Sequence, residues 1–243
     1  MNNLKSRQWI ELNAEKIYKN KVNIVASLKL NLDGTIKNYV IKYFGWRNKI
    51  SYMLSPFMRS RAKKTYDNSL LLLENGVNVP KPIAVYTERK LGFIMTNFII
   101  MEEIENYRLA RSVLRDISVN FEDKIKIVKK IAEFVKTIHN MGFTHNDLTL
   151  GNFLIDSNGK VFIVDLNRMK RKVFLSSYFR MYDISKLNLC NCRLEYEHDN
   201  CLYREFLKEY SIQPEKDVGK LQKAIKNNLL RHNTKRFFRQ YRR

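Results

Sequence analysis

Residues 144–152 read Thr-His-Asn-Asp-Leu-Thr-Leu-Gly-Asn, and residues 161–165 read Val-Phe-Ile-Val-Asp. Two carboxylates and an amide of these segments, Asp147, Asp165 and Asn152, are expected in loops or at strand ends. Phosphoryl transfer needs such a set, because a carboxylate and an amide can hold metal ions against phosphates while a second carboxylate positions the attacking hydroxyl. Oxygen ligands of this kind suit Mg²⁺. The two segments therefore predict a phosphoryl-transfer site.

The elements around these segments are predicted from their hydrophobic pattern. A Gly34 turn between residues 21–30 and 35–44 indicates a hairpin. Residues 57–75 predict a helix with Gly76 at its C-cap, followed by an extended Pro-containing stretch and one or two strands over residues 91–104. Apolar side chains at helical spacing predict a second helix over residues 121–140. Two short strands, 153–155 and 161–166, then flank a turn.

The character of the chain changes near residue 104, from an antiparallel sheet with one helix to a mainly helical remainder. We therefore predict an α+β protein with two lobes, residues 1–103 and residues 104–243. The length of 243 residues is sufficient for two lobes that share a cleft. Taken singly, Asp147 or Asn152 would be interpreted as a turn or capping residue. Their spacing between a helix and a hairpin that ends at Asp165 makes that interpretation improbable.

The pattern H-x-D-x-x-x-x-N at His145, Asp147 and Asn152, with Asp165 after the next strand, resembles the catalytic loop and metal-binding Asp of the protein-kinase-like superfamily. The resemblance implies a two-lobed protein-kinase-like fold that uses ATP and Mg²⁺. It also implies that Asp147 is the catalytic base, that Asn152 and Asp165 bind the metal and the nucleotide, and that His145 braces the loop.

Further positions follow from the same resemblance. Lys42, at the end of Val-Ile-Lys, resembles the strand lysine that contacts the α- and β-phosphates. The segment Met-Glu-Glu-Ile at 101–104 resembles the hinge, where backbone groups of Glu102 and Ile104 would bind adenine. Asp183 resembles the buried helical Asp that anchors the catalytic loop, although a helix N-cap is an equal alternative.

Several departures from the superfamily pattern affect the phosphate-binding side. Residues 18–23 contain no glycine, so phosphate binding there is doubtful or relies on Asn20 and Lys21. The acidic partner of Lys42 is not evident, and the helix position where relatives carry Glu falls near Thr65, with Asp67 and Asn68 close by.

Other departures concern the acceptor. Thr149 stands where protein Ser/Thr kinases carry Lys, and few residues separate Asp165 from Asp183, which disfavours a peptide substrate. Residues 60–66, 76–82, 165–168 and 183–187 resemble the lipopolysaccharide core kinase family, which phosphorylates Kdo or heptose hydroxyls of the inner core. Alternatives are a kinase of the aminoglycoside or choline kinase-like type and a basic pseudokinase scaffold that binds anionic partners.

The net charge of +21 favours anionic partners. Basic clusters without acids lie between residues 166 and 182 and from residue 218 to the end. A lipopolysaccharide core or another anionic sugar-lipid, at an anionic membrane surface, agrees with this charge, whereas nucleic acid is disfavoured because no binding motif is present. The stripe Leu221, Ile225 and Leu229 suggests either a basic amphipathic tail on the bilayer or a helix packed on the second lobe.

No segment has the apolar core of a signal peptide or a membrane span, which predicts a cytoplasmic protein, with peripheral binding to the inner face of the cytoplasmic membrane as an option. Cys190, Cys192, His198 and Cys201 could in principle supply four zinc ligands. Their spacing matches none of the common zinc patterns, so reduced thiols are the better interpretation.

Overall fold

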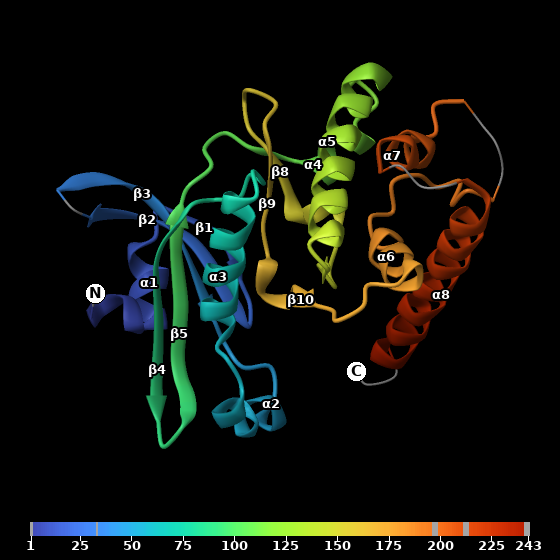
Figure 1. The fold of residues 1–243 in the computed structure, drawn as a ribbon. Coiled ribbons are helices and arrows are strands. Elements are labelled where there is room, and N and C mark those ends of the chain that lie inside the picture. The colour runs from blue at the N-terminus through green and yellow to red at the C-terminus, as the bar shows by residue number, and fades with distance from the viewer. Residues whose placement is uncertain (1, 33, 196–198, 211–213, 241–243) are drawn as a thin grey trace. The chain divides into compact units, whose positions relative to one another are not determined.

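The computed structural model describes residues 2–32, 34–195, 199–210 and 214–240. The chain forms two compact units (Figure 1). The first comprises residues 1–105 together with 165–167, and the second comprises residues 106–164 together with 168–243. Three residues that include Asp165 thus belong with the first unit, although the chain around them belongs to the second.

The first unit is built on a five-stranded antiparallel sheet with the order β1-β2-β3-β5-β4. The predicted hairpin is confirmed, because Leu32 pairs with Thr35 across a two-residue turn that contains Gly34 at φ +79°. The first strand was not predicted. The strands are β1 (Lys16–Asn20), β2 (Asn23–Leu32), β3 (Thr35–Phe44), β4 (Pro82–Lys90) and β5 (Phe93–Glu102).

Helices of the first unit begin and end at local capping signals. The predicted helix over residues 57–75 begins later, because Ser60 accepts a hydrogen bond from the Lys63 N–H and so caps the first turn. It ends before Gly76, whose φ of +74° is easily adopted by glycine. The helical segments are η1 (Asn2–Lys5), α1 (Arg7–Asn13), α2 (Lys49–Met53), η2 (Ser55–Phe57) and α3 (Arg61–Glu74).

Alternation along β3 places Lys42 on the face of the sheet that α3 covers. Ile41 packs in one apolar cluster, with Ile10 of α1, whereas Phe44 packs in the other, with Ala62 of α3. Because successive strand side chains point to opposite faces, Lys42 lies on the same face as Phe44. Its ammonium group lies 5.3 Å from the centre of the Phe44 ring.

The second unit is mainly helical, with two small sheets of order β10-β7 and β6-β8-β9. The predicted helix over residues 121–140 is confirmed with the same bounds. Its helices are α4 (Ala110–Arg115), α5 (Phe121–Asn140), η3 (Leu150–Asn152), α6 (Ser177–Ile184), α7 (Leu202–Tyr210) and α8 (Pro214–Gln240). Its strands are β6 (Arg108–Leu109), β7 (Phe143–Thr144), β8 (Phe153–Ile155), β9 (Val161–Ile163) and β10 (Lys170–Arg171), and η4 (Leu166–Arg168) precedes β10.

Helix α5 forms the centre of the second unit. Asn120 caps its first turn by accepting from the Asp123 N–H, and Glu122 and Asp123 complement the helix dipole there. Val128, Ile131 and other apolar side chains of one face are fully buried. Helix α7 packs against α5, and its Phe206 and Tyr210 rings stack at a centroid distance of 5.9 Å.

Two residues of the apolar stripe on the C-terminal helix are not available to a bilayer. Leu221 and Ile225 are buried, and α8 packs on α6. Burial in the second unit therefore corrects the hypothesis of a membrane-bound stripe at these two residues and agrees with the alternative of a helix packed on the second lobe. In the described part of the chain, no helix has both the length and the apolar character required to cross a membrane.

Candidate active site

The predicted strand lysine is paired with the predicted metal-binding carboxylate. Lys42 Nζ lies 2.7 Å from Asp165 Oδ1, and the side chains of the two residues are 10% and 28% exposed. Burial lowers the pKa of Lys42, and the charge and hydrogen bond of Asp165 oppose this effect. The first unit therefore supplies the carboxylate partner that the sequence did not reveal.

The backbone around Asp165 is held by two amide side chains. Asp165 has a φ of +66°, and the Asn167 Nδ2 donates to its Oδ1 at 2.6 Å. The Asn68 Nδ2 of α3 donates to the Leu166 carbonyl at 2.9 Å. Asn68, one of the residues near the helix position considered for the acidic partner of Lys42, thus contacts the backbone next to Asp165 and not the Lys42 side chain.

The other two residues considered as partners of Lys42 have different contacts. Asp67 pairs with Arg59 and, at 2.9 Å, with Lys63. Thr65 Oγ1 donates to the Arg61 carbonyl one turn earlier in α3. Neither side chain pairs with Lys42, and the Asp165 carboxylate takes that position.

The turn between β1 and β2, where a glycine-rich loop is expected in relatives, is held by an arginine from α1. Arg7 Nη2 donates to Asn20 Oδ1 and to the Lys21 carbonyl, both at 2.8 Å. Gly45, just after β3, approaches this turn so closely that a Cβ there would lie 2.1 Å from the Val22 carbonyl oxygen. Arg7 was missed because nothing in a short N-terminal helix indicates that it contacts a turn more than ten residues later.

The predicted hinge residues lie at the end of β5. The Glu102 N–H donates to the Lys81 carbonyl at 2.9 Å, and its side chain pairs with Lys37 at 3.1 Å. Ile104 lies two residues beyond the end of the strand. Adenine binding by backbone groups of Glu102 and Ile104 stays a prediction.

In the second unit, the catalytic loop brings Asp147 and Asn152 together. The Asn152 Nδ2 donates to the Asp147 carbonyl at 2.7 Å, so the amide oxygen is the atom left to bind a cation. The Val164 N–H donates to the Asn152 carbonyl at 2.9 Å, which ties this loop to the chain immediately before Asp165. The Asp147 carboxylate is partly exposed, as a group that meets a substrate must be.

Arg168 was noted in the sequence only as part of a basic cluster and of the resemblance over residues 165–168, and no role at the site was predicted for it. Its Nη1 lies 3.2 Å from Asp147 Oδ2. The Asn146 Nδ2 donates to the Arg168 carbonyl at 3.1 Å and so fixes the backbone of that residue. Arg168, at the end of η4, thus brings a positive charge to the carboxylate of Asp147, the predicted catalytic base.

The side chain of Asp183 anchors the backbone of the catalytic loop. Its Oδ2 accepts from the His145 N–H at 2.6 Å, and its Oδ1 accepts from the Asn146 N–H at 2.9 Å. Burial alone would raise the pKa of Asp183, but the hydrogen bond with His139 and the charge of Lys186 hold it below its usual value. Asp183 lies in the last turn of α6, and Ser176 is the N-cap, so the N-cap alternative for Asp183 is wrong.

His139 connects Asp183 to α7. Its Nδ1 lies 2.6 Å from the Tyr210 hydroxyl and its Nε2 lies 3.5 Å from Asp183 Oδ2. Burial lowers the pKa of His139 more than Asp183 raises it, so the ring is neutral at neutral pH. With Tyr210 O–H donating to Nδ1, the proton resides on Nε2 and faces the carboxylate.

Comparisons with known proteins agree with these features. Residues 26–210 match the model of the lipopolysaccharide kinase (Kdo/WaaP) family. The chain is 30% identical to a 3-deoxy-D-manno-octulosonic acid kinase of Vibrio parahaemolyticus, over 53% of this chain and 52% of the relative. A protein of the same name from Vibrio vulnificus is 31% identical over 51% of each chain. The KEOPS complex subunit Bud32 of Pyrococcus abyssi is 32% identical over 38% of this chain and 37% of the relative.

The chain thus spans about half the length of the kinases that it matches. The predicted α+β, two-lobed protein-kinase-like fold is confirmed, with a five-stranded antiparallel sheet and α3 in one unit and a mainly helical second unit. The match of residues 26–210 covers most of the sequence. On this match, and with the catalytic-loop pattern intact, the chain belongs to the lipopolysaccharide kinase (Kdo/WaaP) family.

Proposed function

We propose that this protein is an ATP-dependent kinase that phosphorylates a sugar hydroxyl of the lipopolysaccharide inner core. One observation carries the proposal. In this member of the family, the Asp183 carboxylate accepts hydrogen bonds from the backbone N–H groups of His145 and Asn146, directly before Asp147. The relatives from Vibrio are 3-deoxy-D-manno-octulosonic acid (Kdo) kinases by name, which supports Kdo over heptose as the acceptor.

The donor atoms of the site fit Mg²⁺. The Asn152 nitrogen is engaged by the Asp147 carbonyl, which leaves the amide oxygen, and Asp165 adds a partly exposed carboxylate. Hard oxygen donors in small number are the ligands that Mg²⁺ takes beside nucleotide phosphates. When bound, the ion would neutralise charge on the phosphate that is transferred.

The remaining chemistry falls to residues of the chain. Asp147 accepts the proton of the acceptor hydroxyl and orients its oxygen toward the phosphate. Arg168, through its contact with Asp147, fixes the direction of that carboxylate and adds positive charge where the acceptor arrives. Lys42, which is paired with Asp165, would bind the nucleotide phosphates, and Asp165 would then hold the metal. Backbone groups of Glu102 and Ile104 bind adenine.

The acceptor is membrane-bound, and a segment of the second unit suits a lipid surface. The basic residues Lys170 and Arg171 of β10 are exposed, and beside them Val173 and Phe174 are 111% and 78% exposed. Basic side chains near an anionic surface each contribute about 1 kcal/mol, and exposed apolar side chains add to this by entering the interface. We call residues 170–174 the basic-apolar segment, and we propose that it binds the cytoplasmic membrane face peripherally.

Phosphate transfer is tested with purified full-length protein, labelled ATP, Mg²⁺ and two dephosphorylated acceptors, one ending in Kdo and one in heptose. We expect label in the Kdo lipid, and none with Asp147→Asn. Label only in the heptose lipid would show that heptose, and not Kdo, is the acceptor. Label in an aminoglycoside or amino alcohol in place of either lipid would favour the small-molecule kinase, and transfer to no acceptor would favour the scaffold.

Membrane binding is tested by flotation with vesicles of anionic and of neutral lipid. The double substitution Val173→Ser and Phe174→Ser should reduce flotation with anionic vesicles several-fold. Ile117→Ser, which changes another fully exposed apolar residue of the second unit, is the matched control and should float like the wild type. Equal flotation of the double variant would remove the role of the basic-apolar segment while leaving the transfer assay unaffected.

A further inference from the structure

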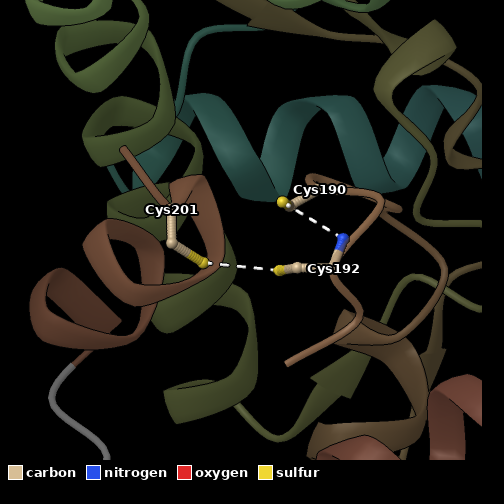
Figure 2. A group of neighbouring side chains, drawn as sticks. All are labelled: Cys190, Cys192 and Cys201. Carbon is tan, nitrogen blue, oxygen red and sulfur yellow. Dashed lines mark hydrogen bonds between the residues drawn. The ribbon is translucent and has the colours of Figure 1, made fainter. Parts of the chain in front are cut away.

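Three cysteine sulfurs of the second unit converge on one point (Figure 2). The Sγ atoms of Cys190, Cys192 and Cys201 all lie within 4.8 Å of one another, and those of Cys192 and Cys201 are 3.6 Å apart. A disulfide would require about 2.05 Å. A tetrahedral zinc ion with Zn–S bonds of about 2.3 Å sets its sulfur ligands about 3.8 Å apart. The sulfurs therefore lie near the spacing of metal ligands.

The chain after Cys190 folds so that backbone N–H groups point at the sulfurs. The Cys192 N–H donates to Cys190 Sγ at 3.4 Å, and the Leu194 N–H donates to Cys192 Sγ at 3.5 Å. The second contact depends on two consecutive left-handed residues, Arg193 at φ +53° and Leu194 at φ +63°. Hydrogen bonds of this kind stabilise sulfur in its anionic form, which is the form that binds a metal.

The third sulfur comes from a separate element. Cys201 directly precedes α7, and the N–H groups of Tyr203 and Arg204 in the first turn favour its thiolate. The helix dipole acts in the same direction. Without a metal, however, burial raises the pKa of both Cys192 and Cys201. The metal-free thiols are therefore protonated, and neither has the lowered pKa of a reactive nucleophile.

A path from solvent reaches the cluster. Cys190 is partly exposed and lines a cavity of about 550 Å³ together with Leu114, Arg115, Leu150 and Asn191. Cys192 and Cys201 are buried behind it, at 1% and 5% exposure. An ion can therefore enter past Cys190 and end in a site with two shielded ligands.

We propose that Cys190, Cys192 and Cys201 bind one zinc ion through three thiolates. Each Zn–S bond forms as the thiol proton leaves to solvent, so three protons are released per ion. Thiolates select zinc over Mg²⁺ and Ca²⁺, which prefer oxygen ligands. His198, the fourth ligand in the sequence pattern, lies outside the described residues, so the site is defined by its three sulfurs, and its fourth position is open to water or another donor.

The zinc site would fix the start of α7. Cys201 precedes this helix, and Tyr210 at its end contacts His139, which faces Asp183. Zinc would cross-link Cys201 to Cys190 and Cys192 and so close the chain between them into a loop. Such a cross-link lowers the conformational entropy of the unfolded chain and stabilises the folded unit. The ion therefore acts as a structural support for the anchor of the catalytic loop.

The first experiment uses the wild-type full chain, so that no variant has to fold. Protein purified under reducing conditions without chelator should contain about one zinc per chain. Replacement by Co²⁺ should give a sulfur-to-cobalt charge-transfer band and the visible bands of a tetrahedral ion. The Mg²⁺ site proposed for catalysis has only oxygen ligands and cannot produce the charge-transfer band. Bound zinc should also protect the three thiols from alkylation.

Variants then identify the ligands. Cys190→Ser, Cys192→Ser and Cys201→Ser should each weaken zinc binding at least about tenfold, a loss seen even for residues that only support a ligand. Cys190→Ser is the mildest test of folding, since this residue is partly exposed. Asp165→Asn is the control and should bind zinc like the wild type while failing in phosphate transfer.

Two results would overturn the zinc site. They are wild-type protein that takes up no zinc, and a cobalt spectrum without the thiolate band. Neither of these results would affect the kinase proposal, because phosphate transfer is measured separately.

Discussion

Two buried or half-buried aspartates, one in each unit, are held in opposite ways. Asp165 is 28% exposed, and its Oδ1 lies 2.7 Å from the ammonium group of Lys42. Asp183 is 2% exposed and accepts two backbone N–H groups, with His139 and Lys186 beside it. The carboxylate that we propose to bind a metal keeps access to solvent. A carboxylate that only fixes a loop is enclosed among donors of the backbone.

The largest effect should come from the carboxylate that we propose to bind a metal. Asp165→Asn removes the anionic metal ligand, so phosphate transfer should fall about 10³-fold, as when a group that stabilises transition-state charge is lost. The rate is measured with labelled ATP. Asp67→Asn, a surface acid of α3 paired with Lys63, is the control and should retain activity. Activity of Asp165→Asn within tenfold of the wild type would contradict a metal-binding role.

The enclosed carboxylate, Asp183, should contribute to the free energy of unfolding. Asp183→Ala leaves the His145 and Asn146 N–H groups without their acceptor, so the free energy of unfolding should fall by about 3 kcal/mol. Urea unfolding followed by circular dichroism measures it. Asp217→Ala, which removes a half-buried partner of Lys220 and Ser177, should change it by less than about 1 kcal/mol. Similar losses for both variants would show that Asp183 is not a special anchor.

A substitution of Arg168 tests whether its ion pair with Asp147, in the second unit, contributes to catalysis. Arg168→Ala should lower kcat about tenfold, because Asp147 loses the charge that directs it. Arg168→Lys should recover part of the loss, and Lys170→Ala, in the neighbouring exposed strand, should not affect kcat. A change in stability with unchanged kcat would make Arg168 a structural residue only.

The smallest effect is a pH dependence of stability. The pKa of His139 in the folded chain lies below its usual value of 6.5, so the unfolded chain binds more protons. The stability from the neutral ring is therefore present above about pH 6.5 and is lost as the pH falls toward the folded pKa. His139→Gln should reduce the slope of the free energy of unfolding in this window. An unchanged slope would mean that His139 is not buried in its neutral form.

Local patterns predicted much of the fold. The α5 helix and the β2–β3 hairpin each follow from a strong periodicity or a turn with glycine. Helix α1 and strand β1 were not predicted, because each contains few apolar residues. Helix α1 packs on β2 and strand β1 pairs with β2, so both depend on a sheet formed by later residues. The start of α3 was placed too early, since the preceding segment is also rich in residues compatible with helix.

The site was predicted from spacing and not from contacts. Asp147 and Asn152 come together within one loop, so their relation could be inferred from the sequence. Arg168, Asn68 and Arg7 were missed because each acts through a contact that only the folded backbone creates. The cysteine pattern was interpreted as three reduced thiols, because linear spacing alone does not reveal that Cys201 returns to Cys192.

The short segment after Asp165 has a consequence for control. Lys170 and Arg171 pair with Thr144 and Phe143, just before the catalytic loop, and the Lys172 N–H donates to the Gly142 carbonyl. In regulated protein kinases, the corresponding segment is long and becomes ordered on phosphorylation. Here the segment from Lys170 to Lys172 is paired with the chain just before the catalytic loop. We therefore expect the rate of the proposed kinase to follow the concentration of acceptor, without a prior ordering of this segment by phosphorylation.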